Sequence, residues 1–552
     1  MNGFYFGFIW LLLAFATCQS TPQVSTPLGR IEGKLDTTVN GKTFYSFEGV
    51  PYARPPLGKY RFKEAVPPKP WEGIWKANTK YECMQYNHFA RLESDPIDGT
   101  EDCLYVNIYT PKIHAKLDVI VYIHGGAFMF GSGAIYQPHI LLDKNVVYVT
   151  LNYRLGPLGF LSTEDDVSPG NNGLKDQILA LKWVKENIQY FGGNPNSITI
   201  TGTSAGGASV HFHTLTEESR GLFKAGISMS GCMLNPWVLM ENPLERAMEL
   251  GTLVGCEAES TQSLVDCLRK RPAKQIVGAV GEFQPWKYNP FSPFGVVVDE
   301  WSADPVLPKH PLQILEERDV SDTPWIISHT SGEGLYPGAE FYPEENLKYI
   351  DEHWEDILPH ILHFNSTVEK SNQKYVNDRI REEYLGSQPI TQKNFNKLID
   401  ILSDRLFNAD IDKCTRLQAA AIESPVYHYL FDYRGKHSWT ELGSGTTDNI
   451  GVSHADDTVY VLKTEVDTLS TEEDRAISKF MVDTFISFAK NGKPTDDVEW
   501  PEVSKNKVDP IKYIRISSSF SLEEVEEFGN RKFWDSLPFG ENERLFKVKD
   551  EL

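Results

Sequence analysis

Short apolar runs alternate with helix-like segments along much of the chain. Leu174–Ile188 has apolar residues at helical spacing, and Ala205–Leu215 resembles the start of a helix. We interpret the apolar runs Val119–Ile123 and Val146–Leu151 as strands, and Asn196–Thr201, Pro324–Ser328 and Val426–Tyr433 as further strand candidates. Strands that alternate with helices favour a mostly parallel sheet with crossover helices on its faces.

Two stretches, Asn235–Asp322 and Tyr342–Ser424, look less regular than the rest. We interpret them as insertions that cap or flank a site. The sequence has no internal repeat and no low-complexity linker, so we expect residues 19–552 to form one domain, although their number would allow more.

Composition narrows the class of protein. The apolar content of 41% is that of a globular chain with a large core and not of a disordered one. The 54 Lys and Arg residues against 76 Asp and Glu residues give a formal charge of −22. That charge argues against nucleic acid and against anionic membrane surfaces as partners.

Both ends of the sequence carry targeting signals. Phe4–Ala16 is almost wholly apolar and small residues follow it, which predicts a signal peptide over residues 1–18, although no Lys or Arg precedes the run. The run is too short for a stable membrane anchor. Lys549–Leu552 spells KDEL, a retention address read by a retrieval receptor. We therefore expect a protein of the endoplasmic reticulum lumen.

An oxidising lumen permits disulfides and glycans. Two cysteine pairs lie close enough in sequence to close a loop each: Cys83 with Cys103, and Cys256 with Cys267. We interpret Cys232 as a small buried apolar residue, and Cys414 has no assignment. Asn365 begins an Asn-Ser-Thr sequon, which is either a surface glycosylation site or an unused sequon.

The segment Gly202–Gly206 reads G-T-S-A-G and matches a nucleophile elbow. Such an elbow turns sharply from strand to helix, and side chains at its two outer positions would collide. A predicted strand precedes this segment and a predicted helix follows it, which is the required context. Ser204 is therefore the candidate nucleophile.

A second motif, His124–Phe128, reads H-G-G-A-F and follows a predicted strand directly. Glycines let backbone N–H groups approach and stabilise a developing oxyanion. The candidate donors are the N–H groups of Gly125, Gly126 and Ala205. The simpler alternative is an ordinary glycine turn.

A serine nucleophile needs a base and an orienting acid. Glu333 lies just beyond the predicted strand Pro324–Ser328, and His454 ends a loop after the strand Val426–Tyr433, so both would reach the working edge of a parallel sheet. The competing acids and bases are Asp456, Asp457, His329 and His437. The alternative for each competitor is a solvated loop residue.

With these motifs in place, the sequence resembles the type B carboxylesterase/lipase family, which includes the cholinesterases. The resemblance spans nearly the whole mature chain. Its further landmarks are Gly49–Ala53, Pro55–Gly58, Glu101–Asn107, Asn152–Arg154 and Gly170–Gln177. It implies an α/β-hydrolase fold, with a large, mostly parallel sheet flanked by helices and cap-like insertions around a gorge.

The resemblance also implies the triad Ser204–Glu333–His454, the three oxyanion donors and the two disulfides above. Ser230 matches a hydroxyl that lies near the triad His in relatives. Two departures stand out: Thr203 replaces a common Glu, and the segment between Cys83 and Cys103 contains no Trp to bind choline. Acetylcholinesterase activity is therefore not expected.

The predicted activity is hydrolysis of carboxylic esters, of xenobiotic or lipid- and hormone-like kind, through an acyl-enzyme. The chemistry needs no metal and no organic cofactor. The alternatives are a protein that sequesters esters or organophosphates by slow turnover, and a non-enzymatic interaction protein of the same fold.

Overall fold

The computed structural model describes residues 21–90, 95–495 and 497–542. The predicted signal peptide, residues 1–18, and the KDEL tail, residues 549–552, lie outside the described residues. Among the residues described, there is no helix of sufficient length and apolarity to span a membrane.

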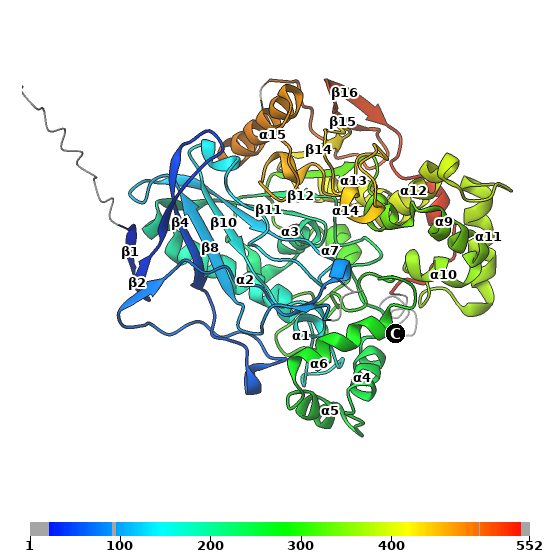
Figure 1. The fold of residues 1–552 in the computed structure, drawn as a ribbon, viewed down its shortest axis with the longest axis horizontal. Helices are drawn as coiled ribbons and strands as arrows, with labels where there is room; N and C mark the ends of the chain where they lie inside the picture. The colour runs from blue at the N-terminus through cyan, green and yellow to red at the C-terminus, as the bar shows by residue number, and fades with distance from the viewer. Residues whose placement is uncertain (1–20, 91–94, 496, 543–552) are drawn as a thin grey trace, which may run out of the picture.

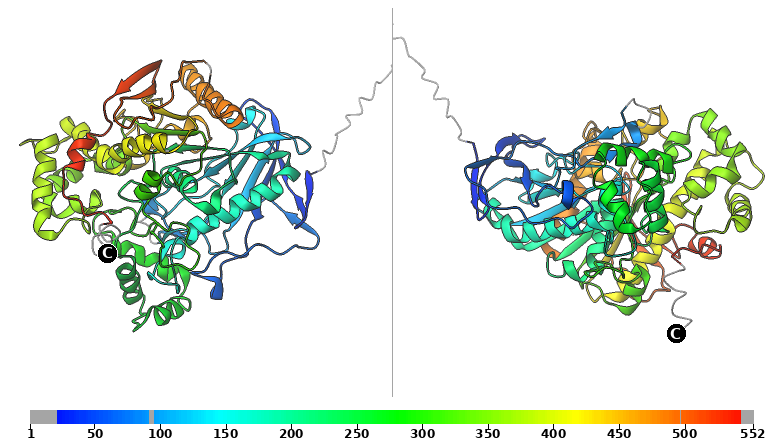
Figure 2. Two further views of the ribbon diagram at one scale, coloured as in Figure 1. Left: turned by 180° about the vertical axis from the view of Figure 1, so that it is seen from behind. Right: turned by 90° about the horizontal axis from the view of Figure 1, so that it is seen from below.

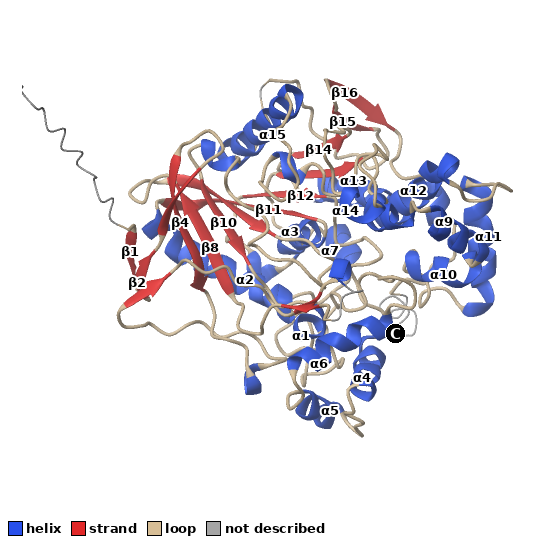
Figure 3. Cartoon of the chain, in the orientation of Figure 1, coloured by secondary structure: helices blue, strands red, loops and turns tan. Residues whose placement is uncertain are grey.

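One large sheet organises the described chain (Figure 1, Figure 3). It has eleven strands in the order β16-β15-β14-β13-β12-β11-β9-β10-β8-β4-β3. The strands from β10 through β15 in this order run parallel, and both edges are antiparallel. The bounds are β3 Lys34–Thr37, β4 Thr43–Pro51, β8 Tyr105–Thr110, β9 Leu117–Ile123, β10 Val147–Leu151, β11 Gly193–Thr203, β12 Ala225–Met229, β13 Trp325–Thr330, β14 Val426–Phe431, β15 Ile511–Ile516 and β16 Phe520–Val525.

The mostly parallel sheet was predicted from the sequence, and all five predicted strands are confirmed as β9, β10, β11, β13 and β14. Successive residues of β9 face opposite cores. Val119 and Val121 pack in one core with Val184, whereas Ile120 packs in the other with Met481. Burial on both faces explains why β9 is a continuous apolar run.

Helices cover both faces of the sheet (Figure 2). α2 (Asn172–Asn187) and α3 (Ala205–Leu215) contribute to one core, and α15 (Glu472–Asn491) packs on β9 and β11 from the other. The two predicted helices are therefore confirmed. α15 begins with a capping box between Thr471 and Asp474, which satisfies backbone N–H groups at its start.

Of the two stretches that look less regular in sequence, the first has short helices separated by loops, whereas the second is largely helical and so more regular than expected. The first contains α4–α7 and the second α9–α13, with a π-helical turn η9 (Asp404–Asn408) before α13. The helices are α4 Pro243–Leu253, α5 Thr261–Leu268, α6 Ala273–Gly278, α7 Pro311–Glu317, α9 Glu344–Glu352, α10 Trp354–Ile361, α11 Lys370–Tyr384, α12 Phe395–Ser403 and α13 Ala409–Ala421. In Figure 1, α9–α12 form the yellow-green lobe at one end of the molecule, whereas α13 packs on β13 and β14.

Candidate active site

Ser204 stands at the turn from β11 into α3. Its backbone has φ 63° and ψ −126°, a conformation that few residues other than glycine adopt. A Cβ on Gly202 would come within 2.5 Å of Gly206, and a Cβ on Gly206 would strike the Ile123 carbonyl oxygen. The steric reason predicted for the two glycines is therefore present. The turn leaves Ser204 8% exposed at the base of a cavity.

The oxyanion-loop candidates lie against this turn. A Cβ on Gly125 would meet the Thr203 carbonyl oxygen at 2.5 Å, and Gly126 has φ 106°. Among the described residues, no backbone acceptor faces the N–H of either glycine. Ala205 is the first residue of α3, so its N–H has no intrahelical acceptor. The structure thus brings the three predicted donors to one place.

Glu333 and His454 meet across two loops. An isolated parallel bridge between Gly332 and Ser453 aligns the segments that carry them. The Nδ1 atom of His454 lies 2.5 Å from Oε2 of Glu333. His454 is 7% exposed and Glu333 fully buried. The Nε2 atom of His454 is also buried and has no hydrogen-bond partner among the described residues.

Two further donors hold the other oxygen of the Glu333 carboxylate. Ser230 Oγ donates at 2.6 Å and the Thr330 N–H at 2.7 Å, both to Oε1. Burial opposes the ionisation of Glu333, but the nearby His454 and these hydrogen bonds outweigh it, so the pKa of the carboxyl lies below its usual value. Glu333 is therefore held as a carboxylate that faces an imidazole.

Neither competing acid hydrogen-bonds to His454, and both are buried, contrary to the alternative that they are solvated loop residues. Asp456 is 3% exposed and accepts hydrogen bonds from the Ser453 N–H and Ser438 Oγ, both at 2.7 Å. Asp457 is fully buried and accepts one from Tyr429 Oη at 2.9 Å. Burial raises the pKa of each carboxyl to about 6. Asp456 thus anchors the loop that carries His454.

The competing bases are also placed elsewhere. His329 is only 2% exposed, contrary to the alternative that it is solvated, and its Nδ1 lies 3.0 Å from Nε2 of His428. Burial lowers the pKa of His329 to about 4, so the ring is neutral at pH 7. His437 lies near the surface, 3.2 Å from the Glu441 carboxylate.

A cavity of about 800 Å³ opens over Ser204 and His454. Gly125, Gly126 and Thr203 also line it. Thr203 is neutral and buried, and its hydroxyl lies 2.5 Å from that of Thr458.

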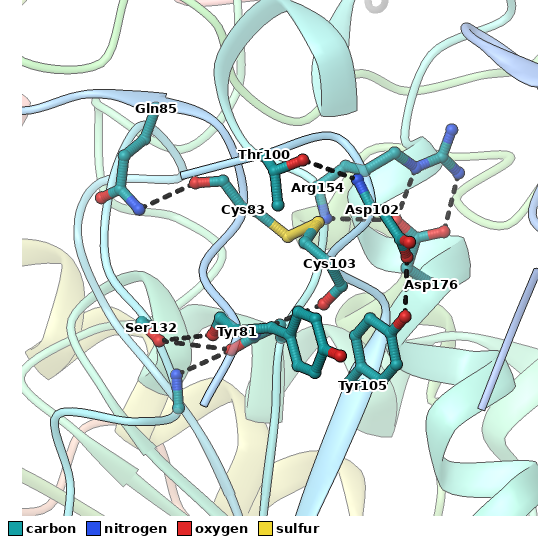
Figure 4. Close-up of a disulfide and its surroundings, with 12 residues drawn as sticks. Tyr81, Cys83, Gln85, Thr100, Asp102, Cys103, Tyr105, Ser132, Arg154 and Asp176 are labelled. Carbon is teal, nitrogen blue, oxygen red and sulfur yellow. Dashed lines mark hydrogen bonds and ion pairs between the residues drawn. A yellow bond between two sulfur atoms is a disulfide. The ribbon is translucent and has the colours of Figure 1, made fainter. Parts of the chain in front are cut away.

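One supporting residue escaped the sequence analysis. Gln85 accepts a hydrogen bond from the Gly131 N–H at 2.7 Å. It also donates one to the Cys83 carbonyl oxygen at 2.9 Å, which Figure 4 shows. It thereby ties the loop after Gly126 to the disulfide segment. A single Gln two residues beyond a Cys carries no signal that sequence reasoning could use.

The structure contains both expected disulfides, Cys83–Cys103 and Cys256–Cys267. Figure 4 shows the first beside the ion pair of Arg154 and Asp176. Cys232 and Cys414 are free and fully buried, as expected for Cys232. With His211 they place three possible ligand atoms within 4.8 Å of one another. However, His211 Nδ1 already accepts the Met233 N–H at 3.1 Å, so the group is a poor metal site.

Comparison with known proteins agrees with this geometry. Residues 20–534 match the model of the carboxylesterase family. The chain is 42% identical over 533 residues to venom carboxylesterase-6 of Apis mellifera, covering 95% of this chain and 96% of that protein. It is 40% identical over 528 residues to esterase FE4 of Myzus persicae, covering 93% of each.

The fold has a solved counterpart. The crystal structure of juvenile hormone esterase from Manduca sexta, with OTFP covalently attached, matches with a TM-score of 0.81 and 27% identity, covering 94% of this chain and 99% of that one. The fold is thus that of the α/β-hydrolases, as the resemblance implied. Fold, family model and relatives agree, and the chain belongs to the carboxylesterase family.

Proposed function

We propose that this carboxylic-ester hydrolase uses Ser204 as nucleophile, His454 as general base and acid, and Glu333 as the acid that orients His454. His454 Nε2 removes the Ser204 proton as Oγ attacks the ester carbonyl carbon. The protonated His454 then gives that proton to the departing alcohol, which leaves an acyl-Ser204 ester. Water, deprotonated by His454, cleaves the acyl-enzyme and releases the acid.

The observation that carries this proposal is the buried pair of Glu333 and His454. Its Nδ1–Oε2 contact of 2.5 Å fixes the ring so that Nδ1 holds a proton and Nε2 remains free to accept one. Ser204 lines the same cavity. Glu333 stays ionised and stabilises the imidazolium that forms during each proton transfer.

The oxyanion needs donors that point at it before it forms. The N–H groups of Gly125, Gly126 and Ala205 would supply them, and one such donor lowers the barrier by about 3 kcal/mol. The N-terminus of α3 adds a favourable field at the same place.

Covalent labelling tests the nucleophile. A fluorophosphonate probe should label the purified protein once, and peptide mass spectrometry should place the label on Ser204. Ser204→Ala should remain unlabelled while its thermal unfolding matches that of wild type. A label on any other residue would refute the assignment.

We also propose that residues 1–18 act as a signal peptide, that Lys549–Leu552 binds the retrieval receptor and that Asn365 carries a glycan. In transfected cells, full-length protein should stay inside and keep a glycan that endoglycosidase H removes. Deletion of the last four residues should move the protein to the medium, and Asn365→Gln should remove the glycan. Equal secretion with and without the tail would contradict retention.

A further inference from the structure

Three large apolar side chains are exposed where the cavity over Ser204 opens, among charged residues. Phe89, Ile135 and Leu442 line the cavity and are 48%, 40% and 52% exposed. They come from η2 (His88–Ala90), the connection between β9 and β10, and α14 (Thr440–Ser444). Single exposed apolar residues need no explanation, but three around one opening indicate a binding surface. We call these three residues the rim.

Aromatic rings connect the rim to the reaction centre. The ring centroid of Phe89 lies 6.2 Å from that of Tyr288, which is 1% exposed. Tyr288 stacks with Tyr336 at 6.0 Å, and Tyr336 stacks with His454 at 5.6 Å. All four rings belong to residues that line the cavity. An apolar chain bound along them would stay in contact with rings from the imidazole to the surface.

The cavity is also larger than a small ester requires. Its volume of about 800 Å³ lies in the range that encloses a drug-sized molecule. An acetate ester would leave most of it to water. A long apolar arm would instead displace that water, and each buried methylene contributes favourably.

The charged groups in the lining disfavour an anionic arm. Four carboxylate residues and two lysines line the cavity, namely Glu82, Asp98, Glu340, Glu465, Lys80 and Lys463. One group of each sign is already paired: Lys80 lies 3.6 Å from Glu48 and donates to Gln137 at 2.9 Å, and Glu340 lies 3.7 Å from Lys287. Three carboxylate residues and one lysine remain in the lining. The chain as a whole carries a formal charge of −22. Both the lining and the net charge therefore repel a carboxylate on either arm of the ester.

We propose that the preferred substrates are uncharged esters with one long apolar arm, and that the rim residues Phe89, Ile135 and Leu442 determine this preference by covering the outer part of that arm. The inference rests on the proposed function, because it assumes that the ester carbonyl lies at Ser204. It adds that specificity is decided at the mouth of the cavity, far from the reacting atoms.

The test is a chain-length series. For wild type, kcat/KM should rise from p-nitrophenyl acetate through butyrate and octanoate to decanoate, by up to about fourfold for each methylene buried. A parallel series of alkyl acetates varies the alcohol arm. A rise in either series supports the proposal and identifies the arm, whereas two flat series would overturn it.

Rim variants locate the effect. Phe89→Ser combined with Leu442→Ser should lower kcat/KM about tenfold or more for the longest ester of the responsive series, and less than twofold for the acetate. Leu253→Ser is the matched control, because Leu253 is 43% exposed on α4 and does not line the cavity. Equal losses on short and long esters, or equal effects of the control, would show that the rim does not select substrates.

The predicted preference for uncharged esters is tested with a charged substrate. A p-nitrophenyl ester whose long acyl arm ends in a carboxylate should be turned over at least tenfold more slowly than the uncharged ester of equal length, and equal turnover would contradict this part. Failure of the proposed function would look different. It would leave wild type and Ser204→Ala with equal turnover of p-nitrophenyl acetate, whether high or absent, whereas failure of the inference leaves a turnover of acetate that depends on Ser204.

Discussion

Replacing Glu333 by Gln would change one atom in the buried pair and disturb three hydrogen bonds. Oε1 accepts from Ser230 and Thr330, so the amide oxygen of Gln is best placed there. The amide NH₂ then faces His454 Nδ1 and can only donate to it. The ring must move its proton to Nε2, which can no longer accept the proton of Ser204.

The size of the effect follows from this tautomer. Where an orienting carboxylate of a serine hydrolase becomes an amide, the loss in kcat is about 10⁴-fold. The opposite orientation of the Gln amide keeps the correct tautomer but leaves NH₂ against two donors, at a cost of about 1–3 kcal/mol for each unsatisfied group. We therefore expect kcat to fall by roughly 10³- to 10⁴-fold.

The assay is steady-state hydrolysis of p-nitrophenyl butyrate, with active sites counted by titration and folding checked by circular dichroism. Asp456→Asn is the matched control, because Asp456 is equally buried but bonds the Ser453 N–H and Ser438 Oγ, not the His454 ring. Its kcat should fall less than tenfold. The reasoning fails if Asp456→Asn is the more damaging change, or if Glu333→Gln keeps more than a tenth of wild-type kcat.

Two further predictions concern Asp457 and Ser230, which lie near the pair of Glu333 and His454. Burial raises the pKa of Asp457 to about 6, so the contribution of this carboxyl to stability is most favourable below pH 4 and is lost as pH rises through 6. Urea unfolding between pH 4 and 8 should therefore show the stability of Asp457→Asn rising by about 2 kcal/mol relative to wild type. A stability difference that stays constant over this pH range would contradict the buried charge. Ser230 helps to lower the pKa of Glu333, so Ser230→Ala should lower kcat about tenfold and the unfolding free energy by about 1.5–3 kcal/mol at pH 7. That stability deficit should shrink as pH falls and Glu333 is protonated, and a deficit independent of pH would contradict it.

The features that sequence patterns predicted well are those with a strict local cause. The strand β9 is buried on both faces, which requires a continuous apolar run. A Cβ on Gly202 would collide with Gly206, and one on Gly206 with the Ile123 carbonyl oxygen, so the turn at Ser204 requires both glycines and a short motif records them. Glu333 and His454 could be assigned only by their place after predicted strands and by resemblance, because their partners are distant in the chain.

The misses have physical reasons too. In the second insertion, Leu398, Ile399 and Leu402 of α12 are buried at helical spacing. Charged residues lie between such apolar positions, so the helical periodicity is hard to recognise from the sequence of the whole insertion. Asp456 and Asp457 looked like solvated acids because their hydrogen-bond donors come from Ser438, Tyr429 and other segments. Burial of a carboxylate depends on such tertiary partners, which a single sequence does not reveal.

Turnover of p-nitrophenyl butyrate by wild type and Ser204→Ala, followed from the first milliseconds, tests the central claim most directly. The account predicts sustained release of p-nitrophenol by wild type and loss of that release in the variant to the level of the buffer control. A single stoichiometric burst followed by near silence would indicate a sequestering protein. Release that survives the loss of the Ser204 hydroxyl would contradict the mechanism altogether.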